Sequence, residues 1–219
     1  MPQSTPARGR GRPAKLSREQ IIDCALKLIE RSPGQKITMT GVAKALGTAP
    51  MSLYTHVQHR DDLMDGIAER VMGQIDLSLA ADAPWEDNVR EWLMRCHKHL
   101  SRYPQVVQLL PESNRIPPSW LRVHAPLIQT LHRAGFRGAA LAQASQWLAH
   151  QLLCSLVMAT ARPNDTNLQQ QLDVALSAIS PEQQLLFKEI QPHLEADHRL
   201  FPYNVEQVIL ALKARLELH

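Results

Sequence analysis

Basic side chains are the chemical groups that cluster most clearly in this 219-residue chain. The first 60 residues carry ten lysines and arginines but only three acidic residues, a net charge of +7. The whole chain carries +3, so the remaining residues sum to about −4. A basic head on a slightly acidic body favours a polyanion as the partner of the head. On charge alone, a solvated basic tail without a partner is the alternative.

Residue types that could catalyse a reaction or bind a metal do not stand in the spacings that those functions need. The motif Cys96-His97-Lys98-His99 resembles a metal site, but neighbouring residues on a helix point apart. His150 and Cys154 share a helix face, and two ligands do not make a zinc site. The chain contains no G-x-S-x-G, phosphate-binding loop, dinucleotide fingerprint or H-E-x-x-H motif. We therefore expect no enzyme, no metal and no cofactor.

The cysteines and the N-terminus indicate a cytoplasmic protein. Three cysteines lie far apart in the sequence and fit no disulfide spacing, which is typical of a reducing compartment. No apolar stretch follows the basic N-terminus, as a secretory signal would require. Residues 138–161 lack charged side chains and have the length of a membrane span, but Gln143, Gln146 and His150 share one face. We expect this segment to be a helix buried in protein, with no membrane contact.

Helical periodicity runs along the chain, and no strand pattern competes with it, which predicts an all-α fold. Ser17 and Gln20 form a capping box for a first helix, which should end near residues 32–34. Thr38 can cap a short second helix that ends at Gly47, and Thr48 can cap a third. A fourth helix starts near Asp61 or Asp62. Further helices are expected at 84–101, 104–110, 118–134, 138–161, from the Ser180 capping box, and at 204–217, with an irregular stretch at 162–170.

Two short helices joined by a glycine turn form a helix-turn-helix, whose second helix can enter a DNA major groove. Residues 37–67 also resemble the N-terminal domain of the tetracycline-repressor (TetR) family. The matching positions are Ile37-Thr38, Val42-Ala43, Leu46-Gly47, Leu53-Tyr54-x-His56-Val57, and Arg60 before Leu63. The match covers about residues 17–67, while residues 80–219 agree only in length and helical character.

The resemblance implies a three-helix DNA-binding domain joined through a connecting helix to a larger ligand-binding and dimerisation domain. The expected divisions are a flexible basic arm (1–16), the helix-turn-helix domain (17–60), the connecting helix (61–79) and the C-terminal domain (80–219). In this scheme the recognition helix is 49–57, with Leu53 and Val57 in the core. Base edges would face Ala49, Pro50, Met51 and Thr55, and phosphates would meet Thr38, Thr40, Lys44, Ser52, Tyr54, His56 and Arg60. Because the base-facing side chains are mostly apolar, they should contact thymine methyl groups, with Thr55 as the main polar reader.

The basic arm contains a second DNA-binding signal. Gly9-Arg10-Gly11-Arg12-Pro13 resembles the core of the AT-hook, in which arginines enter a narrow A·T-rich minor groove. Homeodomains combine a major-groove helix with such an arm. We expect Arg10 and Arg12 to bind DNA in this way, and a disordered tail that supplies only nonspecific charge is the alternative.

The C-terminal domain of TetR-like proteins implies a homodimer and a small-molecule effector. The helices 138–161 and 204–217 would form a four-helix interface, unless both simply fill a monomer core. A fixed interface lets two recognition helices contact half-sites about 34–36 Å apart on a palindromic operator. The effector is unknown. Its pocket could be lined by Trp92, His99, Trp120, His124, Trp147, His150 and Met158, each of which could equally be an ordinary core or surface residue.

The sequence therefore predicts a homodimeric transcriptional regulator, a ligand-responsive repressor that binds double-stranded operator DNA. Two alternatives remain open. One is a sequence-tolerant architectural DNA-binding protein, which the apolar recognition surface would suit. The other is a small-molecule-binding protein without operator specificity, which no motif supports.

Overall fold

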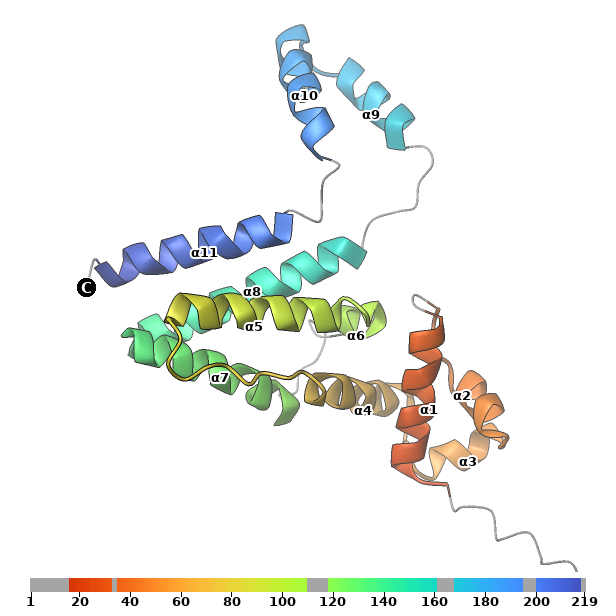
Figure 1. Cartoon of the computed structure of the whole chain (residues 1–219). Coiled ribbons are helices and arrows are strands. Elements are labelled where there is room, and N and C mark those ends of the chain that lie inside the picture. Colours follow the sequence, from red (N-terminus) through yellow and green to blue (C-terminus); the bar gives the residue numbers. More distant parts are fainter. Residues whose placement is uncertain (1–15, 33–34, 110–117, 161–167, 195–199, 218–219) are drawn as a thin grey trace, which may run out of the picture. The chain divides into compact units, whose positions relative to one another are not determined.

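The computed structural model describes residues 16–32, 35–109, 118–160, 168–194 and 200–217 (Figure 1). These ranges are helical and contain no strand, so the all-α prediction is confirmed. In chain order the helices are α1 (Arg18–Arg31), α2 (Met39–Leu46), α3 (Pro50–Tyr54), α4 (Arg60–Gly73), α5 (Trp85–Leu100), α6 (Pro104–Leu109), α7 (Pro118–Ala134), α8 (Gly138–Thr160), α9 (Leu168–Ser177), α10 (Pro181–Leu194) and α11 (Leu200–Glu217).

Contacts divide the chain into two compact units, residues 1–67 and residues 68–219. The division falls inside α4, beyond the residue 60 at which the sequence places the end of the first domain. Helix α4 ends at Gly73, short of residue 79, where the sequence predicts the end of the connecting helix. Asp76 Oδ1 accepts hydrogen bonds from Ser78 N at 3.0 Å and from Ser78 Oγ at 2.7 Å. Such a local turn competes with helical hydrogen bonding and explains the early end.

Unit 1 contains α1, α2, α3 and the first part of α4. Ser17 and Gln20 cap α1 reciprocally, as the sequence predicts: Ser17 Oγ accepts from Gln20 N, and Gln20 Oε1 accepts from Ser17 N. Apolar side chains from these helices and from the loops between them form the core of unit 1. Its buried members are Ile21, Ile22, Ala25, Leu26, Ile29, Ile37, Met39, Val42, Ala43, Leu53, Val57, Leu63, Met64 and Ile67.

Unit 2 is organised around α5, which packs against α6, α7, α8 and α11 (Figure 1). Trp92 on α5 is fully buried, and its indole Nε1 donates to the Val123 carbonyl on α7 at 2.7 Å. Leu148, Leu152 and Leu156 of α8 are buried as well. No helix within the described ranges has the length and apolar character that crossing a bilayer requires.

Three local predictions differ from the structure. Ala49, not Thr48, is the N-cap of α3, and no side chain caps that helix, whose first residue Pro50 has no N–H that would need an acceptor. Helix α9 is missing from the prediction, since its polar start resembles an irregular stretch, although glutamine and leucine favour helices. Helix α11 starts at Leu200, before the predicted residue 204. The rest of the predicted irregular stretch, residues 162–167, lies outside the described residues.

Candidate nucleic-acid interface

The turn between α2 and α3 is fixed at both ends by helix-terminating residues. Thr38 Oγ1 accepts a hydrogen bond from Gly41 N at 3.1 Å and so caps α2, as predicted. At the other end, Gly47 has φ 65° and ψ 32°, the left-handed conformation that glycine adopts without strain. Thr48 N then donates to Ala43 O at 3.0 Å. This closed turn sets the angle at which α3 leaves α2.

Helix α3 is shorter than the predicted recognition helix. It spans Pro50–Tyr54, and the following residues 55 and 56 form a turn. The side chain of Thr55 donates to the Ser52 carbonyl at 2.8 Å, and His56 N and Val57 N both donate to Leu53 O at 2.9 Å. These hydrogen bonds turn the chain at residues 55 and 56 and so end the helix. The fully buried side chains of Leu53 and Val57 anchor the segment, as predicted.

The outer surface of α2 and α3 carries most of the residues predicted to contact DNA. Met51 is 75% exposed and Tyr54 is 44% exposed. Ser52 and His56 are half-buried. The other exposed candidates are Thr38, Thr40, Lys44, Ala49, Pro50, Thr55 and Arg60. The surface therefore combines a small apolar patch with hydroxyl groups and flanking cations, a composition suited to thymine methyl groups and phosphates.

Three of these polar side chains already have partners in the protein. The hydroxyl oxygens of Thr38 and Thr55 are engaged at the α2 cap and at the Ser52 carbonyl. Arg60 Nε donates to Ile37 O at 3.4 Å, and its guanidinium lies 4.0 Å from the Asp61 carboxylate, the limit of an ion pair. The Arg60 guanidinium is therefore held near the start of α2 and keeps donors available for a phosphate.

Asp62 is a structural residue of this interface whose role is not visible in the sequence. Its carboxylate accepts from Arg18 Nη2 at 2.7 Å and from Gln58 N at 3.0 Å, and so ties the α3–α4 loop to α1. The hydrogen bond from Arg18 lowers the pKa of the Asp62 carboxyl. In the sequence Asp62 is only a first-turn acid suited to the helix dipole, because its partner stands 44 residues away.

The predicted minor-groove residues Arg10 and Arg12 lie outside the described residues, so their contact with DNA stays a prediction.

Three of the predicted effector-binding residues, Trp92, Trp120 and His124, are in contact in unit 2, where Trp120 is 36% exposed, and His99 lies apart from them on α5. His124 is 6% exposed, its ring stacks on that of Trp120 at 3.8 Å, and the edge of Trp92 lies 5.5 Å away between centroids. His124 Nδ1 is 2.8 Å from Trp120 O, while the buried Nε2 has no hydrogen-bond partner. His99 Nε2 is 2.9 Å from Val71 O. Burial lowers the pKa of both histidines, so both are neutral at pH 7.

The other three effector-binding candidates lie on one exposed face of α8. Trp147, His150 and Met158 are exposed and share that face with Cys154. The spacings of three, four and four residues keep them aligned along the helix. The structure therefore separates the predicted set into a group around the buried Trp92 and His124, called the interior group below although Trp120 reaches the surface, and an exposed stripe on α8.

Unit 1 has the architecture of a helix-turn-helix domain, and the whole chain that of an all-helical regulator with such a domain at its N-terminus. No family model matches the sequence. An HTH-type transcriptional regulator of Saccharopolyspora erythraea is 23% identical over 141 residues, which cover 64% of this chain and 60% of the relative. The class D tetracycline repressor protein of Escherichia coli is 34% identical over 92 residues, covering 41% and 42%. The chain thus spans less than two thirds of the curated relatives' lengths.

Solved structures extend the similarity over nearly the whole chain. Apo ActR of Streptomyces coelicolor superposes with a TM-score of 0.78 at 18% identity, covering 93% of this chain and 98% of ActR. The complex of this TetR family protein with actinorhodin gives the same TM-score and identity. Sequence relatives and fold agree on the class of protein that the chain resembles: it is similar to TetR-family transcriptional regulators, in sequence over part of its length and in fold over nearly all of it.

Proposed function

We propose that the protein is a homodimeric, ligand-responsive repressor that binds a palindromic DNA operator through α2 and α3. The observation that carries this proposal is the exposed surface of Met51, Tyr54 and Thr55, held at a fixed angle by the left-handed Gly47 turn and the buried Leu53. A major groove admits a short helix of this kind. The flanking cations Lys44 and Arg60 are exposed and suit the phosphates on either side.

The Tyr54 hydroxyl is the most specific phosphate contact that this proposal assigns. Tyr54→Phe keeps the ring and removes only the hydroxyl, so we expect operator affinity to fall about tenfold, the equivalent of one charge-assisted hydrogen bond. The operator comes from selection in a random duplex-DNA pool. Affinity is then measured by fluorescence anisotropy across salt concentrations, with Tyr203→Phe on the exposed part of α11 as matched control.

The same selection experiment distinguishes the repressor from a second candidate function, that of an architectural DNA-binding protein. The exposed apolar surface around Met51 favours this second candidate. A palindromic winner bound about a thousandfold better than a scrambled duplex supports the repressor. Equal binding of both duplexes with a steep salt dependence supports the architectural protein instead. Full affinity of Tyr54→Phe contradicts the assigned phosphate contact.

The basic arm is proposed to add minor-groove contacts through Arg10 and Arg12. Replacing both by alanine should weaken binding to operators with A·T flanks more than to operators with G·C flanks, because arginine favours the narrow A·T minor groove. The exposed pair Lys27 and Arg31 on α1, replaced by alanine together, controls for the loss of two charges. An equal loss on both flanks would show that the arm supplies only nonspecific charge.

The dimer is proposed to use the exposed stripe on α8, consisting of Trp147, His150, Cys154 and Met158, together with the outer face of α11 around Leu210. Tyr203→Phe keeps the ring on that face, so the DNA-binding control also requires an unchanged dimer in analytical ultracentrifugation. On α11 the exposed residues Tyr203, Gln207 and Leu210 recur at helical spacing. The two helices are neighbours, because Arg215 Nη2 donates to Gln143 Oε1 and their backbones pack together. Apolar side chains on two adjacent helices are what a four-helix interface buries.

A charge inserted into this face should separate the protomers. Leu210→Glu is expected to convert the dimer to a monomer in analytical ultracentrifugation, while Leu121→Glu, at an equally exposed leucine of α7, leaves it intact. Cys154 offers an independent readout. It is the exposed thiol, whereas Cys96 is buried with its pKa raised to about 12 by burial. Maleimide labelling of Cys154 should be slow in the dimer and fast in Leu210→Glu. A dimeric Leu210→Glu variant would place the interface elsewhere.

The effector is proposed to bind beside the interior group of Trp92, Trp120 and His124. Because His124 Nδ1 faces a carbonyl, it carries the proton, and the unpaired Nε2 is a buried acceptor. An aromatic effector with a hydroxyl donor would satisfy this acceptor and stack on the indoles. The solved ActR complexes, with (S)-DNPA and with actinorhodin, support a ligand in this fold.

A further inference from the structure

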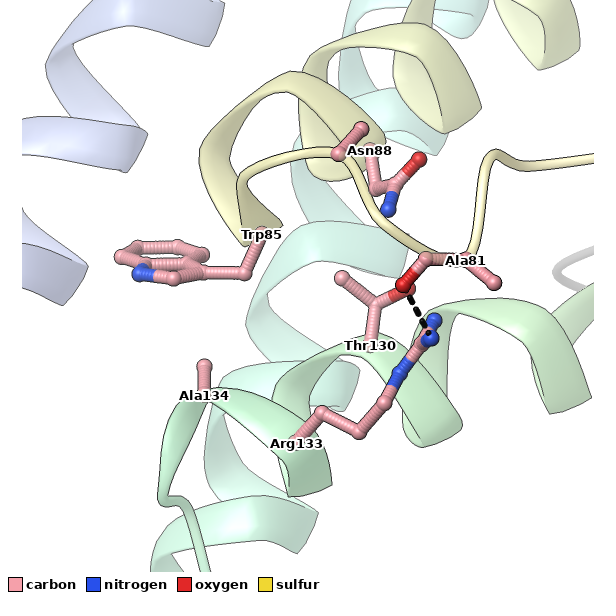
Figure 2. Close-up of a pocket in the computed structure, with 7 residues that line it drawn as sticks. Ala81, Trp85, Asn88, Thr130, Arg133 and Ala134 are labelled. Atoms are coloured by element: carbon pink, nitrogen blue, oxygen red, sulfur yellow. Dashed lines mark hydrogen bonds between the residues drawn. The ribbon is translucent and has the colours of Figure 1, made fainter.

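A cavity lies in unit 2, among residues that the proposed effector site does not use. It has a volume of about 190 Å³ and is formed by the segment before α5, the first turn of α5 and the end of α7 (Figure 2). Its lining residues are Ala81, Ala83, Trp85, Asn88, Thr130, Arg133 and Ala134. A cavity of about 150 Å³ is enough for benzene, so this one accepts a molecule with a single ring.

Thr130 gives the cavity an unsatisfied polar group. Its side chain is 1% exposed, and the Oγ1 atom has no hydrogen-bond partner. A buried hydroxyl without a partner costs about 1–3 kcal/mol. Threonine hydroxyls in helices commonly bond the carbonyl four residues earlier, so the unpaired hydroxyl of Thr130 is unusual. The hydroxyl can donate to a ligand that enters the cavity.

Arg133 adds a cation one helical turn further along α7. Positions 130, 133 and 134 share one face of the helix, and Figure 2 shows the side chains of Thr130 and Arg133 directed towards the segment that carries Ala81. Arg133 Nη1 donates to Ala81 O at 3.0 Å. No carboxylate of the described residues lies within ion-pair distance of this guanidinium, which therefore retains donors for an anion.

The start of α5 contributes a positive dipole end. Pro84 is its N-cap and provides no side-chain hydrogen bond, while the Glu86 carboxylate and the Pro84 carbonyl accept from the backbone N–H groups of Glu86 and Asp87. The two acidic residues in the first turn also have cationic partners. Glu86 lies 2.9 Å from Lys213, and Asp87 lies 2.6 Å from Arg90.

The remaining lining residues make the cavity partly apolar. Ala83 and Ala134 present methyl groups, and the Trp85 ring is held edge-on against Phe136 at 6.4 Å between centroids. The Asn88 amide is fixed by its hydrogen bond to Ala80 O at 2.8 Å. One cation and one free hydroxyl suit a single carboxylate group, and the apolar part suits a small carbon skeleton.

We propose that this cavity is a binding site for a small monocarboxylate, with the carboxylate on Thr130 Oγ1 and the Arg133 guanidinium and the carbon skeleton beside Trp85 and Ala134. The site is independent of the proposed DNA and effector sites. It joins the segment of residues 81–83 to α7, so occupancy should protect this segment from hydrogen exchange.

Benzoate is the probe, and the full-length protein is the sample. Isothermal titration calorimetry should show saturable binding of benzoate and none of benzamide, which has the same shape without the charge. Thr130→Val and Arg133→Gln should each weaken benzoate binding at least tenfold. Lys188→Gln, which removes an exposed cation of α10, should leave it unchanged.

Thr130→Val should also fold normally, since valine matches the shape of threonine and the lost hydroxyl has no partner. If Thr130→Val nevertheless unfolds, Arg133→Gln at the exposed end of the cavity tests the site by itself. Absence of benzoate binding, equal binding of benzamide, or undiminished benzoate binding by the cavity variants overturns the proposal.

Discussion

The interiors of the two units differ in chemistry. Among the described residues of unit 1, every buried side chain is apolar, and no buried polar atom lacks a partner. Unit 2 buries Asn88, Ser119, His124 and Thr130, and the last two contain polar atoms without hydrogen bonds. A core that contains no unpaired polar atoms favours a single packed conformation. A buried polar atom without a partner can instead form its hydrogen bond with a ligand or a water molecule. The difference supports the proposal that unit 1 presents a rigid surface and that unit 2 binds small molecules.

Removing core volume behind α3 is the strongest way to test the rigidity of unit 1. Leu53 is fully buried, so Leu53→Ala should destabilise unit 1 by about 2–5 kcal/mol. Hydrogen exchange by mass spectrometry should show faster exchange throughout α1–α3. Tryptophan fluorescence should report an unchanged midpoint for unit 2, because all four tryptophans lie there.

The control is Met51→Ala on the exposed side of the same helix, whose effect on stability should stay within about 0.5 kcal/mol. If Leu53→Ala lowers the stability of unit 2, measured by fluorescence, as much as that of α1–α3, measured by hydrogen exchange, the two units unfold together. That result would contradict the comparison.

Adding volume between α1 and α4 should have the next largest effect. A β-carbon at Gly66 would lie 2.5 Å from Ile22 Cδ1 and 3.2 Å from Arg18 Nη2. Gly66→Val should therefore destabilise unit 1 by about 1–3 kcal/mol through overpacking. Chemical denaturation followed by hydrogen exchange measures this loss. Unaltered exchange in α1 would mean that the packing of unit 1 is looser than its buried side chains indicate.

Replacing an unpaired polar group of unit 2 should change stability little. His124→Phe keeps an aromatic ring and removes both the unpaired Nε2 and the Nδ1 hydrogen bond to Trp120 O, so the free energy of unfolding of unit 2, followed by tryptophan fluorescence, should fall by no more than about 1 kcal/mol. The matched substitution is His132→Phe, at an exposed histidine of the same helix. A large loss in His124→Phe alone would show that His124 is structural and weaken the contrast between the units.

The smallest expected effect is a difference between the two units in the pH at which each loses stability. Burial lowers the pKa values of His97, His99 and His124 in unit 2, so the unfolded chain binds protons first, and stability present above about pH 6.5 is lost as the pH falls. In unit 1 the lowered pKa of Asp62 gives stability that is present above about pH 4 and lost only below it. Thermal melts between pH 7.5 and pH 5 should lower the tryptophan midpoint by about a few degrees, whereas hydrogen exchange in α1–α3 changes only below about pH 4.5. A reversed order would contradict the assignment.

Local signals predict unit 1 better than unit 2. The Ser17 capping box, the Thr38 cap and the Gly47 turn each depend on residues within four positions, and all are present in the structure. The predictions for α3 are wrong at its ends, where the Thr55 side chain and the uncapped Ala49 decide the length. The hydrogen bond from Arg18 to Asp62 spans 44 residues and has no local sequence signal.

Sites assembled from distant residues could not be predicted in the same way. The sequence singles out Trp147 and His124 equally, and only the packing of α7 and α8 places one outside and the other inside. The cavity at Thr130 and Arg133 joins α7 to a segment about 50 residues earlier, and neither residue stands in a recognisable motif. Residue types therefore indicate chemistry, while burial decides which of them meet.

The turn at Gly47 has a stereochemical consequence. Its φ of 65° disfavours L-residues by backbone conformation alone, since a β-carbon there would meet no atom within 4 Å. A mirror-image residue prefers that same φ. D-alanine introduced at position 47 by chemical ligation should therefore fit this turn. Like any replacement of glycine by alanine, it reduces the conformational freedom of the unfolded chain, so it should stabilise the domain by about 0.4–1 kcal/mol. The handedness of a single position, rather than any side-chain contact, thus governs the direction in which α3 follows α2.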